Sequence, residues 1–81
     1  VLNVRNLTNA DAEIVEFMAE EGSRITRHKI RDLSLPIDAN IGAIVRAGEG
    51  ILVNGETQVI PGDQVVVFCK QHVLRQLERF F

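Results

Sequence analysis

Alternating apolar and polar side chains predict a strand over residues 12–19, near the beginning of the chain. Apolar side chains recur there at every second position, which places them on one face of an extended segment; they are Val15, Phe17 and Ala19. The opposite face carries Ile14 and Met18, with Glu16 between them. A helix is the competing interpretation, because Ala, Glu and Met favour helices. We expect the strand, with one face buried and the other partly covered.

The second half of the chain has the pattern of several strands joined by tight turns. The predicted strands cover residues 41–46, 51–53, 57–60 and 64–69. The glycine-rich residues 47–50 join the first two, Asn54-Gly55 is a strong hairpin signal, and Pro61-Gly62 suits a type II turn. Tight turns join antiparallel strands, so the sheet should be mainly antiparallel. Residues 64–69 are apolar on both faces, which predicts the central strand.

Two helical segments complete the predicted order. Residues 24–33 have apolar side chains too irregularly spaced for one long helix, so we expect a turn and then a short helix over 28–33, ending before Pro36. Residues 70–81 carry apolar side chains at helical spacing, which predicts an amphipathic helix; these are Val73, Leu74, Leu77, Phe80 and Phe81. The prediction is an α+β domain: a mainly antiparallel sheet of about five strands, a short helix after the first strand, and a C-terminal amphipathic helix.

Size and cysteine content bear on how such a domain is stabilised. An 81-residue chain has room for one domain with a marginal core. Cys69 is the only cysteine, so no disulfide forms within the chain, and its place at the end of an apolar run predicts a buried, inert thiol. One Cys and two His are too few for a typical zinc site. Association is the remaining source of stability, and we expect a homodimer.

Charge and composition exclude several classes of partner. The net charge of −2 and the absence of Trp and Tyr argue against a nucleic-acid partner. No apolar run approaches the ~20 residues that a membrane span needs, so direct membrane insertion is not expected. No signal for secretion opens the chain, which indicates a cytoplasmic protein. Residues 1–10 are interrupted by turn-prone residues after Val4, so we interpret them as a lead-in and residues 11–81 as the domain.

Taken in order, these segments resemble the TrkA C-terminal domain, the C-lobe of the family of regulators of potassium conductance. Residues 12–17 resemble its opening strand, residues 41–46 its apolar strand ending in arginine, and residues 61–68 its proline-glycine-aspartate turn and last strand. Further matches in spacing are Ser23, Ile25, Ile30, Leu33, Leu35 and Pro36. The family usually has glycine at the position of Arg27 and often proline near Asn54, so these two turns are where the chain departs from it.

The resemblance implies a regulatory module of a potassium-uptake system, cytoplasmic and held at the inner membrane by a potassium channel subunit. It implies a homodimer, with a small effector such as cyclic di-AMP or a divalent cation at the dimer interface. A nucleotide would bind an upstream lobe to which residues 1–10 lead, because Gly48-Glu49-Gly50 joins two strands and opens no helix for a phosphate. The alternative is the same domain appended to a different ion transporter or exchanger, which the upstream sequence would distinguish.

Two sets of residues are candidates for binding. By resemblance, the effector would be bound by Asn40, Ile41, Ile44 and Arg46. Ile41 and Ile44 also fit the core, and Asn40 a turn. The basic cluster, which we define as Arg24, Arg27, Lys29 and Arg31 with His28 among them, would contact an anion or an acidic partner. A solvated face is its alternative interpretation. Acidic residues gather over 11–21 and would meet this cluster within one chain or across a twofold axis.

No pattern in the chain indicates an enzyme. Glu13 and Glu16 are three residues apart on a predicted strand, so they face opposite ways and neither share an ion nor form an acid–base pair. His28 and His72 stand in unlike contexts, and no nucleophile is matched with a base. We therefore predict no catalytic residue and no metal-binding residue.

Overall fold

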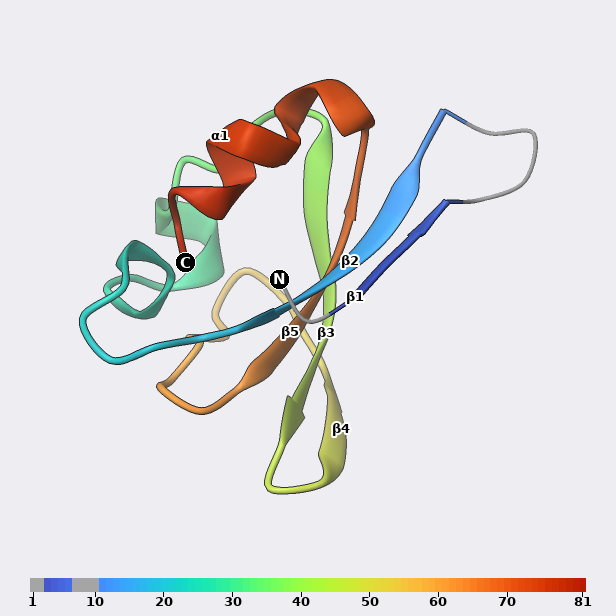
Figure 1. The fold of residues 1–81 in the computed structure, drawn as a ribbon. Coiled ribbons are helices and arrows are strands. Elements are labelled where there is room, and N and C mark those ends of the chain that lie inside the picture. Colours follow the sequence, from blue (N-terminus) through green and yellow to red (C-terminus); the bar gives the residue numbers. More distant parts are fainter. Residues whose placement is uncertain (1–2, 7–10) are drawn as a thin grey trace.

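The computed structural model describes residues 3–6 and 11–81. Its strands are β1 (Asn3–Asn6), β2 (Glu13–Met18), β3 (Ala39–Arg46), β4 (Glu49–Leu52) and β5 (Gln64–Cys69). Its helical elements are the 3₁₀ turns η1 (Arg24–Thr26), η2 (Ile30–Asp32) and η3 (Gln71–Val73) and the helix α1 (Leu74–Glu78). The strands form one antiparallel sheet in the order β1-β2-β5-β3-β4 (Figure 1). The predicted α+β class is confirmed.

The alternation that predicted β2 is also what buries one face of it. Val15 is 0% exposed and Phe17 1% exposed, while Ile14 and Glu16 on the other face stay partly exposed. A helix would have spread these apolar side chains around its axis. The strand β5 lies in the middle of the sheet, bonded to β2 on one side and to β3 on the other. Its place as the central strand is also confirmed.

Two of the predicted turns, at Pro61-Gly62 and between the strands β3 and β4, are present in the structure. Gly62 has a φ of +92° and the amide of Asp63 donates to the carbonyl of Ile60 at 3.1 Å, which is the type II turn expected at Pro61-Gly62. The turn between β3 and β4 is shorter than predicted and uses two residues, Ala47 and Gly48, both with positive φ. Two such residues suit the right-handed twist of a hairpin.

The prediction of a strand over residues 57–60, reached from a hairpin at Asn54-Gly55, is wrong. The side chain of Asn54 closes a local turn by accepting from the amide of Glu56 at 2.8 Å. The segment then leaves the sheet, and its carbonyls serve η2: Thr57 accepts from the amide of Ile30 at 2.9 Å. The strand pairing described for this segment is an isolated bridge between Gln58 and Lys29.

The fifth strand is instead β1, which lies in the segment interpreted as a lead-in. It pairs with β2 so that Val4 lies beside Val15. The other residues of the lead-in, 1–2 and 7–10, lie outside the described residues. Because the strand-like pattern of this segment is short, its partner on β2 decides its conformation.

The short helix expected over residues 28–33 is not formed; the 3₁₀ turn η2 takes its place, and a separate 3₁₀ turn, η1, precedes it. Lys29, between them, is extended with a ψ of 154°, which interrupts any helix there. The amides of Ile30 and Arg31 donate to Thr57 and Gly55, so the backbone of η2 is bonded to another segment. The tertiary bonds thus override the local helical preference.

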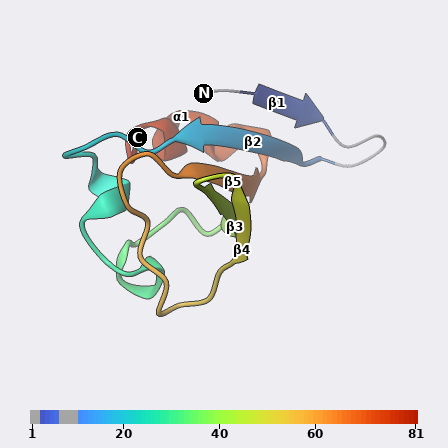
Figure 2. The same cartoon turned by 90° about the horizontal axis from the view of Figure 1, so that it is seen from below.

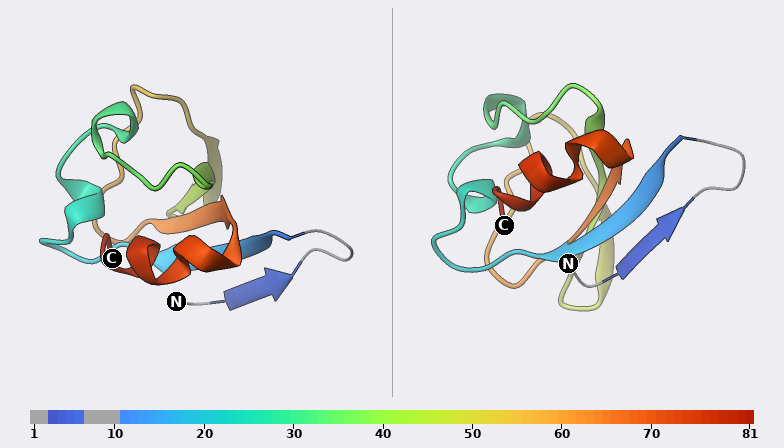
Figure 3. Two further views of the ribbon diagram at one scale, coloured as in Figure 1. Left: turned by 90° about the horizontal axis from the view of Figure 1, so that it is seen from above. Right: turned by 45° about the horizontal axis from the view of Figure 1, so that its top comes forward.

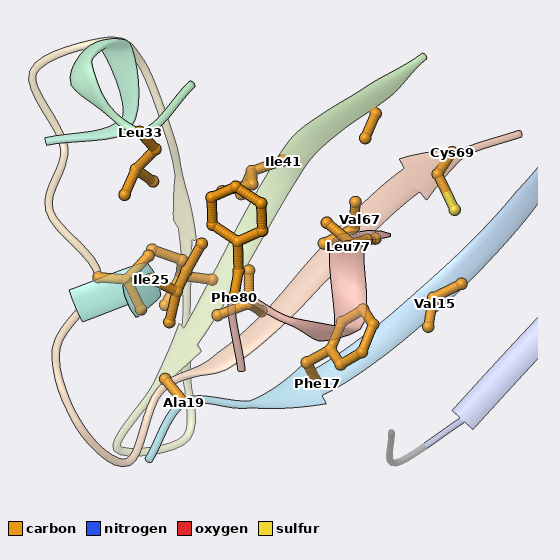
Figure 4. Close-up of a cluster of buried hydrophobic side chains, with 14 of the residues drawn as sticks. Val15, Phe17, Ala19, Ile25, Leu33, Ile41, Val67, Cys69, Leu77 and Phe80 are labelled. Atoms are coloured by element: carbon orange, nitrogen blue, oxygen red, sulfur yellow. The ribbon is translucent and has the colours of Figure 1, made fainter. Parts of the chain in front are cut away.

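The core lies between one face of the sheet and the helical elements on it. Leu77, from α1, and Phe80, which follows it, belong to one buried cluster with Val15, Phe17 and Val67 of the sheet; Figure 4 shows Leu77 beside Val67 and the Phe80 ring near Ile41. Ile25 and Leu33, from the segments around η1 and η2, close the same cluster. The helix α1 and both turns therefore gather on one side of the twisted sheet (Figure 3).

The other face of the sheet, which we call the open face, carries no packed element among the described residues. Strand pairing places there, in adjacent rows, Arg5, Ile14, Phe68 and Asn40, and then Asn3, Glu16, Val66, Ala43 and Leu52. β1 and β4 form the two edges of this face (Figure 2). It is the part of the fold where a sheet residue can meet another molecule.

Candidate functional site

The four residues expected to bind an effector do not share one surface. Ile41 is 9% and Ile44 0% exposed, and both belong to the core cluster. Asn40 is exposed and faces the other way, beside Phe68 on the open face. A register shift between Ile41 and Ala43 keeps Ile41 and Ile44 on the same side. The interpretation of Ile41 and Ile44 as core residues therefore holds, and Asn40 is the fully exposed one of the four.

Arg46, the fourth of these residues, is held by a buried carboxylate. Its Nε donates to Oδ1 of Asp63 at 2.8 Å and its second guanidinium nitrogen donates to Oδ2 at 2.8 Å. Asp63 is 1% exposed. The hydrogen bonds from Arg46, helped by the amide of Ile60, lower the pKa of Asp63 against the opposing effect of burial. Arg46 thus ties the end of β3 to the turn before β5, and an incoming anion would have to compete with Asp63.

The basic cluster is partly neutralised within the chain. The Arg24 guanidinium lies 4.2 Å from the centre of the Phe80 ring, and Arg27 donates to the carbonyl of Gly22 at 2.9 Å. The Glu56 carboxylate forms ion pairs with both Lys29, at 2.9 Å, and Arg31. Both of these cations remain about half exposed.

Lys29 and Arg31 are therefore brought together, and the structure adds a residue that the sequence did not suggest. This residue is Glu56, and its pairing with the two cations could not be predicted because it lies on the segment expected to be a hairpin. Asp32 lies 3.7 Å from Arg31, so two carboxylates accompany these two cations. This balance of charge favours the solvated-face interpretation unless an anion displaces Glu56.

The acidic residues near the start of the domain behave as their spacing predicts. Glu13 is 5% exposed on the core face, and Glu16 lies on the open face. Within the described ranges, no donor reaches Oε2 of Glu13 and no ion pair joins residues 11–21 to the basic cluster. The described ion pairs thus give no support to a meeting of the two charged regions within one chain.

Cys69 is 2% exposed, as expected for a structural thiol. Burial, and secondly the nearby carboxylate of Glu13, raise the pKa of this thiol and keep it protonated. In the part of the chain that the structure describes, no three His, Cys, Asp or Glu side chains come together as metal ligands. None of the described helices is long and apolar enough to cross a membrane.

The open face is the most exposed apolar surface that the sheet presents. Phe68 is 44%, Met18 37% and Leu52 88% exposed. At the β1–β2 side, a depression of about 240 Å³ is lined by Asn3, Arg5, Ile14 and Glu16. One signal of this surface is visible in the sequence, since residues 64–69 are apolar on both faces but a domain of this size has elements to cover only one.

A solved structure described as "Structure of RCK domain with cda" matches this arrangement. Its TM-score is 0.73 at 20% identity, and the match covers 84% of this chain and 96% of that chain. The fold is therefore that of an RCK domain. The family model described as "TrkA-C domain" matches residues 14–81. The chain belongs to the TrkA-C domain family, and the expectation drawn from the sequence is confirmed.

Full-length relatives carry the same family name. A "Trk system potassium uptake protein TrkA homolog" of Archaeoglobus fulgidus is 30% identical over 80 residues, or 99% of this chain and 18% of its own length. TrkA homolog 1 of Methanosarcina mazei is 36% identical over 70 residues, or 86% of this chain and 16% of its own length. TrkA of Halomonas elongata is 32% identical over 85 residues, covering 100% of this chain and 19% of that protein. The chain spans less than a fifth of these relatives.

Proposed function

We propose that this chain is the regulatory C-lobe of a TrkA-like potassium-uptake subunit, which pairs with a second copy and responds to a small effector. The observation that carries this proposal is the TrkA-C match over residues 14–81, because it spans all of the core and most of the sheet. The relatives are named as potassium-uptake proteins, so the partner would be a membrane potassium channel subunit. The lobe would act in the cytoplasm, at the inner membrane, and any nucleotide would bind upstream of it.

The proposed role is binding and transmission of a signal, without chemistry of its own. The names of the relatives denote uptake proteins and no enzyme activity. A binding lobe changes its partner by favouring one of two arrangements, and the effector supplies only its difference in affinity for them. Effector binding at a dimer interface would meet this need, because it can alter how two copies are oriented.

Two surfaces remain as candidates for the effector. Asn40 reaches solvent on the open face, with the Phe68 ring beside it as an apolar contact. Lys29 and Arg31 form a second surface, where a phosphate would replace Glu56 as their shared acceptor. The solved RCK domain with "cda" in its title adds support for a small ligand on this fold. We propose cyclic di-AMP as the first ligand to test and a divalent cation as the second.

The test is the melting temperature of the purified chain with cyclic di-AMP, ATP, NADH, Ca²⁺ and Mg²⁺ in turn. A ligand present at 100 times its dissociation constant should stabilise the fold by about 2.7 kcal/mol. For a domain of this size that is a rise of about 10 °C or more. The double variant Lys29→Gln, Arg31→Gln and the single variant Asn40→Ala tell the two surfaces apart.

Arg75→Gln serves as the matched control, because Arg75 is exposed on α1 away from both surfaces. Loss of the shift in one variant, with the control unchanged, would locate the effector. No shift with any ligand would contradict effector binding and leave the lobe a purely structural module.

A further inference from the structure

The depression at the β1–β2 side of the open face brings one cation and one anion to the same small volume. Its volume is about 240 Å³, and its lining residues are Asn3 and Arg5 of β1 and Ile14 and Glu16 of β2. Strand pairing sets Arg5 opposite Ile14 and Asn3 opposite Glu16, so the two charged residues lie on one diagonal of a four-residue block. Side chains on such a diagonal are close enough to contact one ligand together.

The two charged side chains of the depression are available to a ligand. Arg5 is exposed and Glu16 partly exposed, and neither belongs to an ion pair within the described ranges. This separates them from Lys29 and Arg31, which share the Glu56 carboxylate. A guanidinium and a carboxylate can each form a charge-assisted hydrogen bond with a ligand group of the opposite sign.

The depression stays open because the neighbouring aromatic ring lies over another strand. Phe68 of β5 pairs with Ile14 in the sheet. A Cβ built on Gly42 would overlap the Phe68 ring, so the ring lies directly over this glycine of β3. Ile14, on the other side of β5, therefore remains partly exposed. It gives the depression an apolar contact between its two charged groups.

We propose that this depression binds a free aliphatic amino acid, with the ligand carboxylate on Arg5, the ammonium group on Glu16 and the side chain on Ile14. The guanidinium can offer the carboxylate two parallel hydrogen bonds, and the Asn3 amide can donate or accept one more. The size agrees with this ligand. At about 30 Å³ for each water molecule, the depression has room for about eight non-hydrogen atoms, as many as valine has.

The pairing of both charges is what favours an amino acid over other small ligands. A simple anion on Arg5 would be repelled by the Glu16 carboxylate, and a simple cation on Glu16 would be repelled by Arg5. A cyclic dinucleotide is far larger than the depression. This site is therefore additional to the effector surfaces proposed above, and it does not depend on them.

The test is a ¹⁵N NMR titration of the purified chain with L-valine and with L-leucine. Binding should move the amide signals of Arg5, Ile14 and Glu16, with a dissociation constant of about 1 mM for so few atoms on an open surface. N-acetylvaline lacks the ammonium group and valinamide lacks the carboxylate. Each should bind about tenfold more weakly or worse, because a hydrogen bond to a charged group contributes at least about that factor.

Two variants remove the charges of the depression one at a time. Arg5→Gln and Glu16→Gln should each weaken valine binding by about tenfold or more. The matched controls are Arg75→Gln and Glu78→Gln, which remove one charge of each sign from exposed positions on α1. Both controls should bind valine as the wild type does, and far-ultraviolet circular dichroism should show that all four variants are folded.

Several results would overturn this site. One is that neither amino acid moves the three amide signals at about 20 mM, well above the expected dissociation constant. Others are that N-acetylvaline or valinamide binds as tightly as valine, or that Arg5→Gln or Glu16→Gln binds valine as the wild type does. None of these results bears on the proposed effector response, which is measured with cyclic di-AMP, nucleotides and divalent cations. Failure of all those effectors would likewise leave the amino-acid site standing.

Discussion

Phe80 holds the C-terminal helix on the sheet, and its removal is the most informative perturbation of the fold. The side chain is 2% exposed and lies within the core cluster. The Arg24 guanidinium lies over its ring as a cation–π contact, and its backbone carbonyl accepts a hydrogen bond from the amide of Ile25 at 2.9 Å. One residue therefore joins the end of α1, the turn η1 and the buried face of the sheet.

The magnitude of Phe80→Ala follows from this burial. Replacing a buried Phe by Ala costs about 3–5 kcal/mol, and an 81-residue domain has a total stability of roughly 4–12 kcal/mol. We expect a loss of about 4 kcal/mol and a melting temperature lower by about 20 °C. Phe80→Leu, which keeps most of the apolar volume, should lose less than half as much.

The assay is urea unfolding followed by far-ultraviolet circular dichroism at one fixed protein concentration, because any dimer makes stability depend on concentration. Arg24→Met separates the contribution of the cation over the ring from that of burial, and should cause only a small fraction of the Phe80→Ala loss. A loss below about 1 kcal/mol for Phe80→Ala, the size of a typical surface change, would refute the docking of this residue in the core.

Three further predictions follow from single contacts. Because the folded pKa of Asp63 lies below its ordinary value of 3.8, its pairing with Arg46 stabilises the fold above that value and is lost as the pH falls through the folded pKa. The stability difference between wild type and Asp63→Asn should therefore shrink in urea titrations carried from neutral to acid pH; a constant difference would contradict the pairing. Gly62→Ala should lower the unfolding free energy by about 1–2 kcal/mol in the same assay, because the φ of +92° is strained for any residue with a Cβ. Cys69 should react with a thiol reagent only at the rate of unfolding, and rapid labelling of the native chain would show that its burial is wrong.

The sequence predicted the strands whose pattern reflects burial, and it failed where bonds between distant segments decide the backbone. The alternation at Val15 and Phe17 was enough to place β2, because only an extended segment puts them on one face. Residues 57–60 carry the same kind of pattern, with Val59 fully buried. The carbonyl of Thr57 nevertheless accepts from the amide of Ile30 in η2, a long-range bond that no local pattern could indicate.

In the candidate site, too, local patterns were not enough where contacts between distant segments decide the position of a residue. Ile41 and Ile44 could be interpreted as core or as pocket, and the register shift at Gly42 decides for the core. The partner of Arg46 could not be found from spacing, because Asp63 approaches it only once the type II turn is formed. Glu56 likewise meets Lys29 and Arg31 through a turn that the sequence misplaced.

The position of β5 sets the order in which this lobe can assemble. Glu13 of β2 pairs with Cys69 of β5, near the opposite end of the chain. Because β2 and β3 each pair with β5 and not with one another, they become part of one sheet only when β5 lies between them. Pairing of such distant segments slows folding. A nascent or truncated chain ending before Gln64 would expose two apolar strands with free edges, which are prone to aggregate. The two halves of the sheet are therefore joined only once the last strand of the chain has been added.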